Sequence, residues 1–229
     1  MLFPYALFMC RFLLVQSAEL LTPSELLDAF ARMCRASRSR DDAWQGDGWG
    51  VAWLAPDDTW VIRKSLRPIW EEAGEFRTIP AARVFAIHAR SASNERDSNN
   101  LEFNQPYLDE KYAFVFNGFL RGVTMPRRLE GKIGAQRIWN LIRAEMSTHE
   151  PADALARSVR ELEAHSRQVV ACNVGLINAQ HLYAVSRFAR NPDYYQLRWH
   201  TSDKLRMVCS EPLPGFEFNP VPLDGVTVL

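Results

Sequence analysis

Short runs of apolar residues along the chain predict several buried strands in its first half. Residues 10–16 and 84–89 are almost entirely apolar or β-branched, which is typical of strands buried on both faces. Residues 112–116 form a similar run, and Asn117-Gly118 follows it. Because this dipeptide is common in turns, we expect the strand to end there.

A hairpin is predicted just before the second of these strands. Residues 51–54 and 59–64 are strand-like, and Pro56-Asp57-Asp58 between them is a turn sequence. The Gly-rich segment Asp47-Gly48-Trp49-Gly50 precedes the hairpin and predicts a tight turn.

Three segments have the spacing of helices. The first begins at Thr22-Pro23-Ser24-Glu25, where we expect Thr22 to cap the helix and Glu25 to complete a capping box, and it runs to about Arg35. Residues 134–146 and 151–165 repeat apolar residues every three or four positions. Shorter strands are expected after them, over residues 169–177, 181–186, 195–200, 206–209 and 226–229.

The order of these elements predicts the fold class. Strands come first, a pair of helices lies mid-chain, and strands return, so single strands and helices do not alternate. This order favours an α+β fold over a doubly wound parallel sheet, with the central helices covering one sheet face. No internal repeat or linker composition divides the chain, which predicts one domain.

The net charge and the hydropathy of the chain limit the kinds of molecule that it is expected to bind. The 229 residues contain 27 Lys and Arg against 27 Asp and Glu, so the formal net charge is zero. This balance argues against a nucleic-acid or anionic-membrane binder, and no apolar run approaches the ~18 residues of a membrane span. We therefore expect a small-molecule substrate as partner, with no nucleic acid and no membrane.

The cysteines and histidines indicate no metal site. The four cysteines, at positions 10, 34, 172 and 209, form no C-x-x-C pair, and the five histidines show no H-E-x-x-H spacing. We expect neither a metal nor another cofactor. A chain of this size can form its core without disulfides, which predicts a reduced, cytoplasmic setting.

Several short motifs, weak when taken singly, resemble one family when their order is considered. In chain order, the motifs are Met9-Cys10-Arg11, Asp47-Gly48-Trp49-Gly50, His88-Ala89-Arg90, Asn104-Gln105-Pro106-Tyr107 and Asn117-Gly118. Taken together, they resemble the class II glutamine amidotransferases. Near the C-terminus, Cys209-Ser210-Glu211-Pro212-Leu213 also resembles a segment of the small stand-alone members of that family. The resemblance runs from Met9 to the C-terminus.

The resemblance implies an N-terminal nucleophile (Ntn) hydrolase, with a four-layer αββα sandwich of two antiparallel sheets between helices. In this family the nucleophile is a cysteine, here Cys10, and its own free α-amino group is the base. An ordinary thiol needs such a base near neutral pH. Residues 1–9 would then be a leader absent from the active form, and residues 10–229 a single glutamine amidotransferase domain. Either translation starts at Met9 and this methionine is removed, or residues 1–9 are cleaved; we favour the first route.

The resemblance also implies roles for the other motifs. The Asn117 side-chain amide and the Gly118 backbone N–H would stabilise the oxyanion. Arg90, beside Ser91, would bind the substrate α-carboxylate, a task that suits a planar guanidinium. We expect His88 to be a structural histidine that shares a strand face with Arg90. Asp47 and Trp49 would be structural near the site, Asp47 by ordering its turn or, alternatively, by approaching the Cys10 amine.

The chain departs from the family pattern at two positions. Gly134 stands where the family has the aspartate that binds the glutamine α-ammonium, and Phe116 stands where many members have histidine. Since a buried ammonium without a carboxylate is costly, either another acid replaces the aspartate, Glu130 being nearest in sequence, or the substrate lacks this ammonium.

Three functions remain open. The chain is expected to hydrolyse the side-chain amide of glutamine or a γ-glutamyl amide through a thioester on Cys10. Alternatively, it is a γ-glutamyl amidase for a modified substrate without a free α-ammonium, or a catalytically inactive binding protein on the same fold. The length leaves no room for a synthase domain, so a separate synthase subunit would accept the ammonia if the chain does not act alone.

Overall fold

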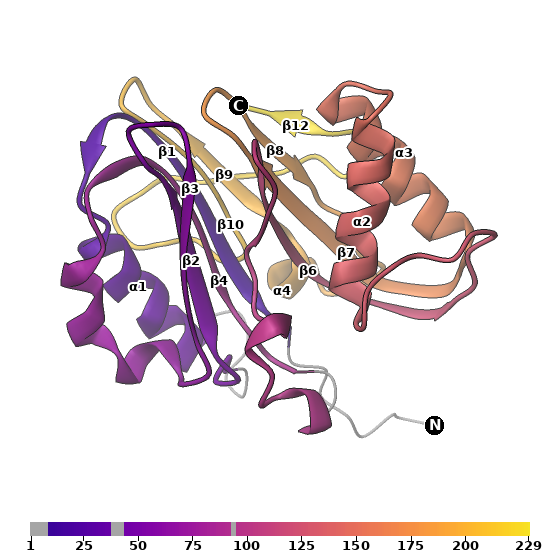
Figure 1. Ribbon diagram of the computed structural model, residues 1–229, viewed down its shortest axis with the longest axis horizontal. Helices are drawn as coiled ribbons and strands as arrows, with labels where there is room; N and C mark the ends of the chain where they lie inside the picture. Colours follow the sequence, from indigo (N-terminus) through magenta and orange to yellow (C-terminus); the bar gives the residue numbers. More distant parts are fainter. Residues whose placement is uncertain (1–8, 38–43, 93–94) are drawn as a thin grey trace.

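A computed structural model describes residues 9–37, 44–92 and 95–229 and contains two antiparallel sheets (Figure 1). In spatial order, the seven-stranded sheet consists of β11 (Asn219–Pro220), β9 (Arg198–Thr201), β10 (Leu205–Cys209), β1 (Arg11–Leu21), β4 (Ala82–Ala89), β2 (Trp49–Leu54) and β3 (Trp60–Ser65). The five-stranded sheet consists of β12 (Thr227–Val228), β8 (Leu182–Val185), β7 (Ser166–Ile177), β6 (Ala113–Val123) and β5 (Tyr107–Leu108).

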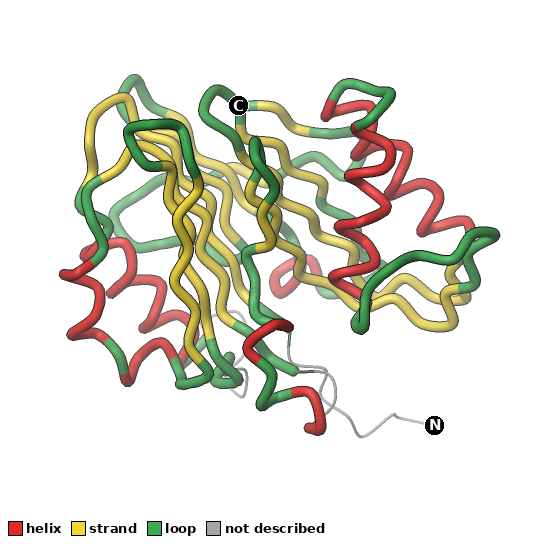
Figure 2. The backbone as a smooth tube through the Cα atoms, in the orientation of Figure 1, coloured by secondary structure: helices red, strands yellow, loops and turns green. Residues whose placement is uncertain are grey.

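Helices cover the outer face of each sheet, as Figure 2 shows in red. The seven-stranded sheet is covered by α1 (Ser24–Arg35) and the 3-10 turns η1 (Ile69–Glu71) and η2 (Ala73–Thr78). The five-stranded sheet is covered by α2 (Gly134–Met146) and α3 (Pro151–Ala164). Three short elements lie in connecting segments: η3 (Glu95–Asp97), η4 (Leu101–Phe103) and α4 (Pro192–Tyr195).

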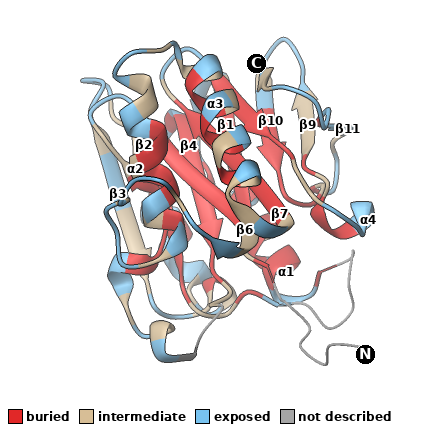
Figure 3. Cartoon of the chain, turned by 90° about the vertical axis from the view of Figure 1, so that its right-hand side faces the viewer, coloured by how far each residue is buried: buried red, intermediate tan, exposed pale blue. Residues whose placement is uncertain are grey.

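Alternating side chains of the strands produce three apolar layers. On β1, Leu13 and Val15 pack toward α1, whereas Phe12 and Leu14 pack toward the other sheet. This alternation follows from the period of two along a strand. In Figure 3 the buried residues run through both sheets and the inner sides of the helices. The predicted α+β, four-layer αββα sandwich is confirmed.

The prediction that a strand ends in a turn at Asn117-Gly118 is wrong. Strand β6 continues through both residues to Val123, with Asn117 paired to Asn173 and Gly118 to Cys172 of β7. The neighbouring strand supplies backbone partners over this whole stretch, and this outweighs the local turn preference of the dipeptide.

Two smaller expectations are also corrected. Helix α1 begins after Pro23 and has no side-chain cap, so neither the Thr22 cap nor the capping box with Glu25 forms. Of the expected strand over residues 195–200, the first residue belongs to the helical turn α4, and β9 begins only at Arg198. The hairpin of β2 and β3 and the helices α2 and α3 lie where the sequence predicted them.

Within the described ranges, no helix is long and apolar enough to cross a membrane. The same residues contain no group of three or more His, Cys, Asp or Glu side chains that could hold a metal ion. Of the expected leader, only Met9 is described, and residues 1–8 lie outside the described part of the chain.

Candidate active site

Cys10 lies directly before β1, on the side of the strand that faces the second sheet. Phe12 and Leu14, two and four residues further, are in the layer between the sheets, and side chains two apart share a face. A cavity of about 1120 Å³ opens at this end of the interlayer. Of the residues that the sequence singled out, Cys10, Arg90, Ser91, Gly118 and Gly134 line it.

The Cys10 thiol is tied to the backbone of Ser91. The Ser91 N–H donates to Sγ at 3.4 Å, and Sγ lies 3.6 Å from the Ser91 carbonyl oxygen. Burial raises the pKa of this thiol, the Asp47 carboxylate adds to the rise, and the Ser91 hydrogen bond and the Arg90 charge oppose it. The thiol is therefore protonated at neutral pH, so a nucleophilic attack from Sγ requires a base.

A buried ion pair fixes the strand next to the thiol. The guanidinium of Arg11 lies 3.5 Å from Glu211, and the Ser37 hydroxyl bridges the two, accepting from Arg11 at 3.2 Å and donating to Glu211 at 2.7 Å. Ser210 accepts a hydrogen bond from the Phe12 N–H at 3.0 Å. The Ser-Glu-Pro-Leu segment thus holds the start of β1, and with it Cys10, in place.

Arg90 lines the cavity, and hydrogen bonds hold one nitrogen of its guanidinium. Its Nη1 donates to the Asp97 carbonyl at 2.8 Å and approaches Asn104 Oδ1 at 3.5 Å, and its Cζ lies 5.6 Å from the Phe103 ring centre. Nε and Nη2 have no hydrogen-bond partner among the described residues. The side chain is thus held on one edge while its other edge remains available for an anion, in the forked geometry that a carboxylate matches.

The backbone N–H of Gly118 points away from β7. Phe116, two residues earlier on β6, donates its N–H to Gln105 Oε1 at 2.6 Å, on the side away from β7. Cys172, opposite Gly118, donates to the Arg187 carbonyl at 2.8 Å, away from β6. Gly118 and Cys172 are therefore a pair that exchanges no backbone hydrogen bonds, which leaves the N–H of Gly118, a residue that lines the cavity, on the side of Gln105.

The Asn117 amide lies behind the cavity surface. Its side chain is 1% exposed, and neither Nδ2 nor Oδ1 has a hydrogen-bond partner in the described part of the chain. It shares a strand face with Val115 and Ala113, which pack between the sheets. An unpaired buried amide costs about 1–3 kcal/mol, so its presence here requires an explanation.

Asn104 and Gln105, for which the sequence predicted no role, connect two parts of the site. The Gln105 side chain clamps Phe116, accepting from its N–H and donating to its carbonyl at 3.2 Å. Asn104 joins Arg90 to the Ser65 carbonyl, to which it donates at 2.7 Å. One loop segment therefore hydrogen-bonds both to β6, which carries Asn117 and Gly118, and to Arg90, the predicted carboxylate-binding residue.

Asp47 and Trp49 are structural neighbours of the site. The Asp47 carboxylate accepts from the Ala92 N–H at 2.7 Å, and the Asp47 N–H donates to the Arg90 carbonyl at 3.1 Å. Trp49 faces away from the cavity, in the layer under α1, and its indole N–H donates to Glu72 at 2.7 Å. Asp47 therefore holds the backbone that follows Arg90. The predicted turn over residues 47–50 is wrong in its second half, because Trp49 and Gly50 belong to β2 and pair with β3 and β4.

His88 is fully buried on the interlayer side of β4. Neither ring nitrogen has a hydrogen-bond partner of good geometry within the described residues. Burial lowers its pKa to about 3, the Phe116 backbone opposes this shift, and the charges of Arg90 and Lys64 add to it. The ring is therefore neutral at pH 7.

Acid should destabilise the fold through His88. Its pKa of about 3 in the folded chain is below the ~6.5 of an unfolded chain, so the unfolded state binds the extra proton between these values. The unfolding free energy should fall with decreasing pH from 6.5, by at most about 1.4 kcal/mol per pH unit. Denaturant titrations at pH 7 and pH 5 should show this loss, and His88→Phe should remove it. An equal loss in both proteins would contradict the assignment.

Gly134, the first residue of α2, leaves open space in the cavity. A side chain at this position would meet no atom within 4 Å. The cavity has two carboxylates among its described lining residues, on Glu130 and Asp97. Glu130 is exposed, whereas Asp97 is half-buried and its carbonyl accepts from Arg90. Sequence reasoning identified Glu130 but missed Asp97, which the loop after Arg90 brings back to the guanidinium.

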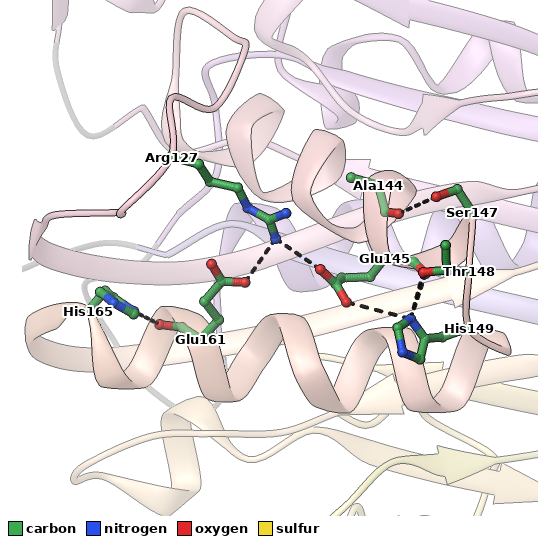
Figure 4. Close-up of polar contacts among 8 residues, drawn as sticks. All are labelled: Arg127, Ala144, Glu145, Ser147, Thr148, His149, Glu161 and His165. Atoms are coloured by element: carbon green, nitrogen blue, oxygen red, sulfur yellow. Dashed lines mark hydrogen bonds and ion pairs between the residues drawn. The ribbon is translucent and has the colours of Figure 1, made fainter.

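The segment between β6 and α2 forms the outer wall of the cavity and is anchored by Arg127. Figure 4 shows its guanidinium between Glu145 of α2 and Glu161 of α3, with Nη2 at 2.9 Å and 3.0 Å from the two carboxylates. Both pairs are partly exposed, so each contributes little alone. Together they hold the wall against both helices.

Solved structures with a similar fold show which fold this chain has. No family model and no curated protein sequence matches the chain. A solved glutamine aminotransferase class-II domain protein from Silicibacter pomeroyi is 16% identical, with a TM-score of 0.64 over 96% of this chain and 94% of that one.

Two further solved structures have related folds. Glutamine phosphoribosylpyrophosphate amidotransferase from B. subtilis is 14% identical, with a TM-score of 0.65, and the match covers 96% of this chain but 49% of that one. A predicted glutamine amidotransferase from Pseudomonas aeruginosa PA01 is 11% identical, with a TM-score of 0.51 and 96% of both chains covered. The chain therefore has the fold of the class II glutamine amidotransferase domains.

Proposed function

We propose that this chain hydrolyses the side-chain amide of glutamine or of a γ-glutamyl compound, with Cys10 as nucleophile. One observation carries the proposal: the thiol at the start of a central strand and the buried side chain of Arg90 line the same cavity. A nucleophile next to a carboxylate-binding group suits a substrate whose amide and carboxylate lie a short chain apart.

The base in this proposal is the α-amino group of Cys10 itself. An α-amine has a pKa of about 7.7–8.0, suited to proton transfer near neutral pH. His88 is a poor base because burial keeps its pKa near 3. The active form therefore begins at Cys10, produced either by removal of an initiating Met9 or by cleavage of residues 1–9.

The reaction proceeds by acyl transfer. The α-amine takes the thiol proton, Sγ attacks the amide carbon, and the same amine returns the proton to the leaving nitrogen. Water then hydrolyses the thioester. The Gly118 N–H and the Asn117 amide are assigned to the oxyanion, each contributing about 3 kcal/mol to lowering the barrier.

The substrate carries either a free α-ammonium or another group at that position. Gly134 supplies no carboxylate there, which favours a modified γ-glutamyl substrate. Asp97 and Glu130 are the acids that would bind an ammonium in the same cavity. Ammonia released from glutamine would pass to a separate synthase subunit or into solution, and the proposed setting is the cytoplasm.

A second candidate function is binding without catalysis. It is favoured by the packed state of Met9, whose N–H donates to the Tyr194 hydroxyl at 3.0 Å while its carbonyl blocks the Cys10 nitrogen. A chain that keeps Met9 would have no free α-amine and no base next to the thiol.

Two measurements test the proposal. The intact mass of the protein from its native host should correspond to a chain that begins at Cys10. That chain, incubated with glutamine and a panel of γ-glutamyl amides, should release ammonia or amine together with the acid. Retention of residues before Cys10 in a chain that is nevertheless active would refute the role of the α-amine.

Replacing Arg90 with lysine should weaken substrate binding more than chemistry. Lysine keeps the charge but loses the second donor of the fork, so we expect KM to rise about tenfold or more while kcat changes less. Steady-state kinetics on the best substrate of the panel would measure both. Arg83→Lys, at an exposed position of the same strand, is the matched control. A silent Arg90→Lys would remove the carboxylate-binding role.

A further inference from the structure

Met9 occupies an apolar site directly beside Cys10. Its side chain is 3% exposed and packs with Ala171, Tyr194 and Tyr195, and the site is closed at its edge by Phe119, Val170 and Phe188. The rings of Tyr194 and Tyr195 meet edge to face at 5.0 Å, and Phe188 stacks on Tyr195 at 6.5 Å. We call these six residues the Met9 site.

Removal of Met9 would leave this site empty, a step that rests on the proposed function. A vacated space lined by apolar side chains stays dry and can bind small apolar molecules, because each lining atom has lost its packing partners. The empty site would lie next to the main cavity, since Phe119 lines both and Cys10, to which Met9 is bonded, lines the cavity. Removal of Met9 would thus open space on the side of the Cys10 nitrogen.

The leaving group of the reaction must lie on that same side. The base that takes the thiol proton later gives it to the leaving nitrogen, so this nitrogen lies within hydrogen-bond reach of the Cys10 α-nitrogen. Met9 is bonded to that α-nitrogen in the unprocessed chain. A substituent on the leaving nitrogen would therefore extend into the space that Met9 vacates, whereas ammonia would leave it empty.

The charges around the site argue against a cationic substituent. The guanidinium of Arg11 lies 4.4 Å from the centre of the Tyr194 ring, and that of Arg121 lies 5.2 Å from the centre of the Phe119 ring. These rings already hold cations against their faces, and a further positive charge between them would be repelled. The site now contains the uncharged side chain of Met9, so an uncharged group of similar length should fit it.

We propose that the vacated Met9 site is a subsite for the amine portion of the substrate, which is a secondary γ-glutamyl amide carrying an apolar alkyl or aryl group on its nitrogen. In the reaction the C–N bond of this amide breaks and an S–C bond to Cys10 forms. The thiol proton passes through the α-amine to the departing primary amine, and water completes the hydrolysis, so no oxidant or other co-reactant is needed.

The test uses the chain that begins at Cys10 and four substrates: glutamine and the N-methyl, N-butyl and N-phenyl amides of γ-glutamate. Each buried methylene is worth about a fourfold gain, so kcat/KM for the butyl amide should exceed that for the methyl amide at least about tenfold. A decrease from methyl to butyl and phenyl would overturn the subsite.

Variants of the site should change the ratio of kcat/KM for the butyl amide to that for glutamine. Ala171→Leu fills the site and should lower the ratio about tenfold or more, and Phe188→Ala removes one wall and should lower it about threefold. Phe216→Ala makes the same truncation against the cluster under α1, where Phe216 contacts His200, and should leave the ratio unchanged. An unchanged ratio in both site variants would overturn the proposal, even if one of them were poorly folded.

The outcomes separate this inference from the proposed function. Hydrolysis of glutamine with rejection of all three substituted amides would leave the proposed function standing and remove the subsite. If a folded chain hydrolyses neither these four nor any other amide of the γ-glutamyl panel, including those with a blocked α-amine, the proposed function fails. Calorimetric titration of the Cys10→Ala chain then decides the subsite, because tighter binding of the butyl than of the methyl amide supports it and equal binding overturns it.

Discussion

Cys10→Ala, in a chain that begins at this residue, should abolish hydrolysis of every amide that the parent protein cleaves. The substitution removes the nucleophile and keeps the α-amine, so the amide has no sulfur to attack it. Loss of a nucleophile typically lowers kcat by about 10³- to 10⁶-fold. Release of ammonia or amine over several hours would measure a decrease of this size.

The matched control is Cys34→Ala. Cys34 is also a free thiol, but it is fully buried under the seven-stranded sheet and does not line the cavity. Burial raises its pKa well above the ordinary range, so it is inert as a nucleophile. Full activity in Cys10→Ala, or an equal loss in both variants, would contradict the assignment of Cys10.

Much of the fold followed from periodicity. Helices α2 and α3 begin and end within a residue of the predicted positions because their apolar residues recur at helical spacing and pack on one sheet. The hairpin of β2 and β3 was predictable from its turn sequence. Local signals failed where a distant strand decides the outcome, as at Asn117-Gly118, where pairing with β7 continues β6 through a turn-like dipeptide.

The sequence indicated which residues belong to the site, but it did not predict how they are arranged or which hydrogen bonds hold them. The motif order brought Cys10, Arg90, Ser91, Gly118 and Gly134 to attention, and all five line one cavity. The Gln105 clamp on Phe116 could not be derived, because a side chain bonding to a strand edge leaves no periodic trace in sequence. The Met9 site was also missed, since it combines side chains from separate segments of the chain that no local pattern links.

Strand β6 continues through Asn117 and Gly118, so the Asn117 side chain and the Gly118 N–H point in different directions. The side chain lies on the face toward the other sheet, whereas the N–H lies on the side away from β7. Each donor therefore needs its own test in the proposed reaction.

Asn117→Leu should lower kcat by about 10²- to 10³-fold, the effect of losing one oxyanion donor. It should do so without destabilising the fold. The Asn117 amide is buried with no partner in the described part of the chain, and replacing such a group by an apolar one of similar shape is nearly neutral or stabilising. Single-turnover kinetics and denaturant unfolding of the same preparation would measure both effects.

Asn173→Leu, on the paired strand β7, should destabilise the fold, in contrast to Asn117→Leu. The Asn173 amide donates to the Tyr195 carbonyl at 2.6 Å and accepts from the Ser186 hydroxyl at 3.2 Å and the Arg187 N–H at 3.1 Å. Its loss leaves these groups unpaired, so we expect a decrease of about 1–3 kcal/mol in unfolding free energy. If Asn117→Leu instead lost stability and kept its turnover, the buried amide would be a structural group, and the oxyanion would depend on Gly118 alone.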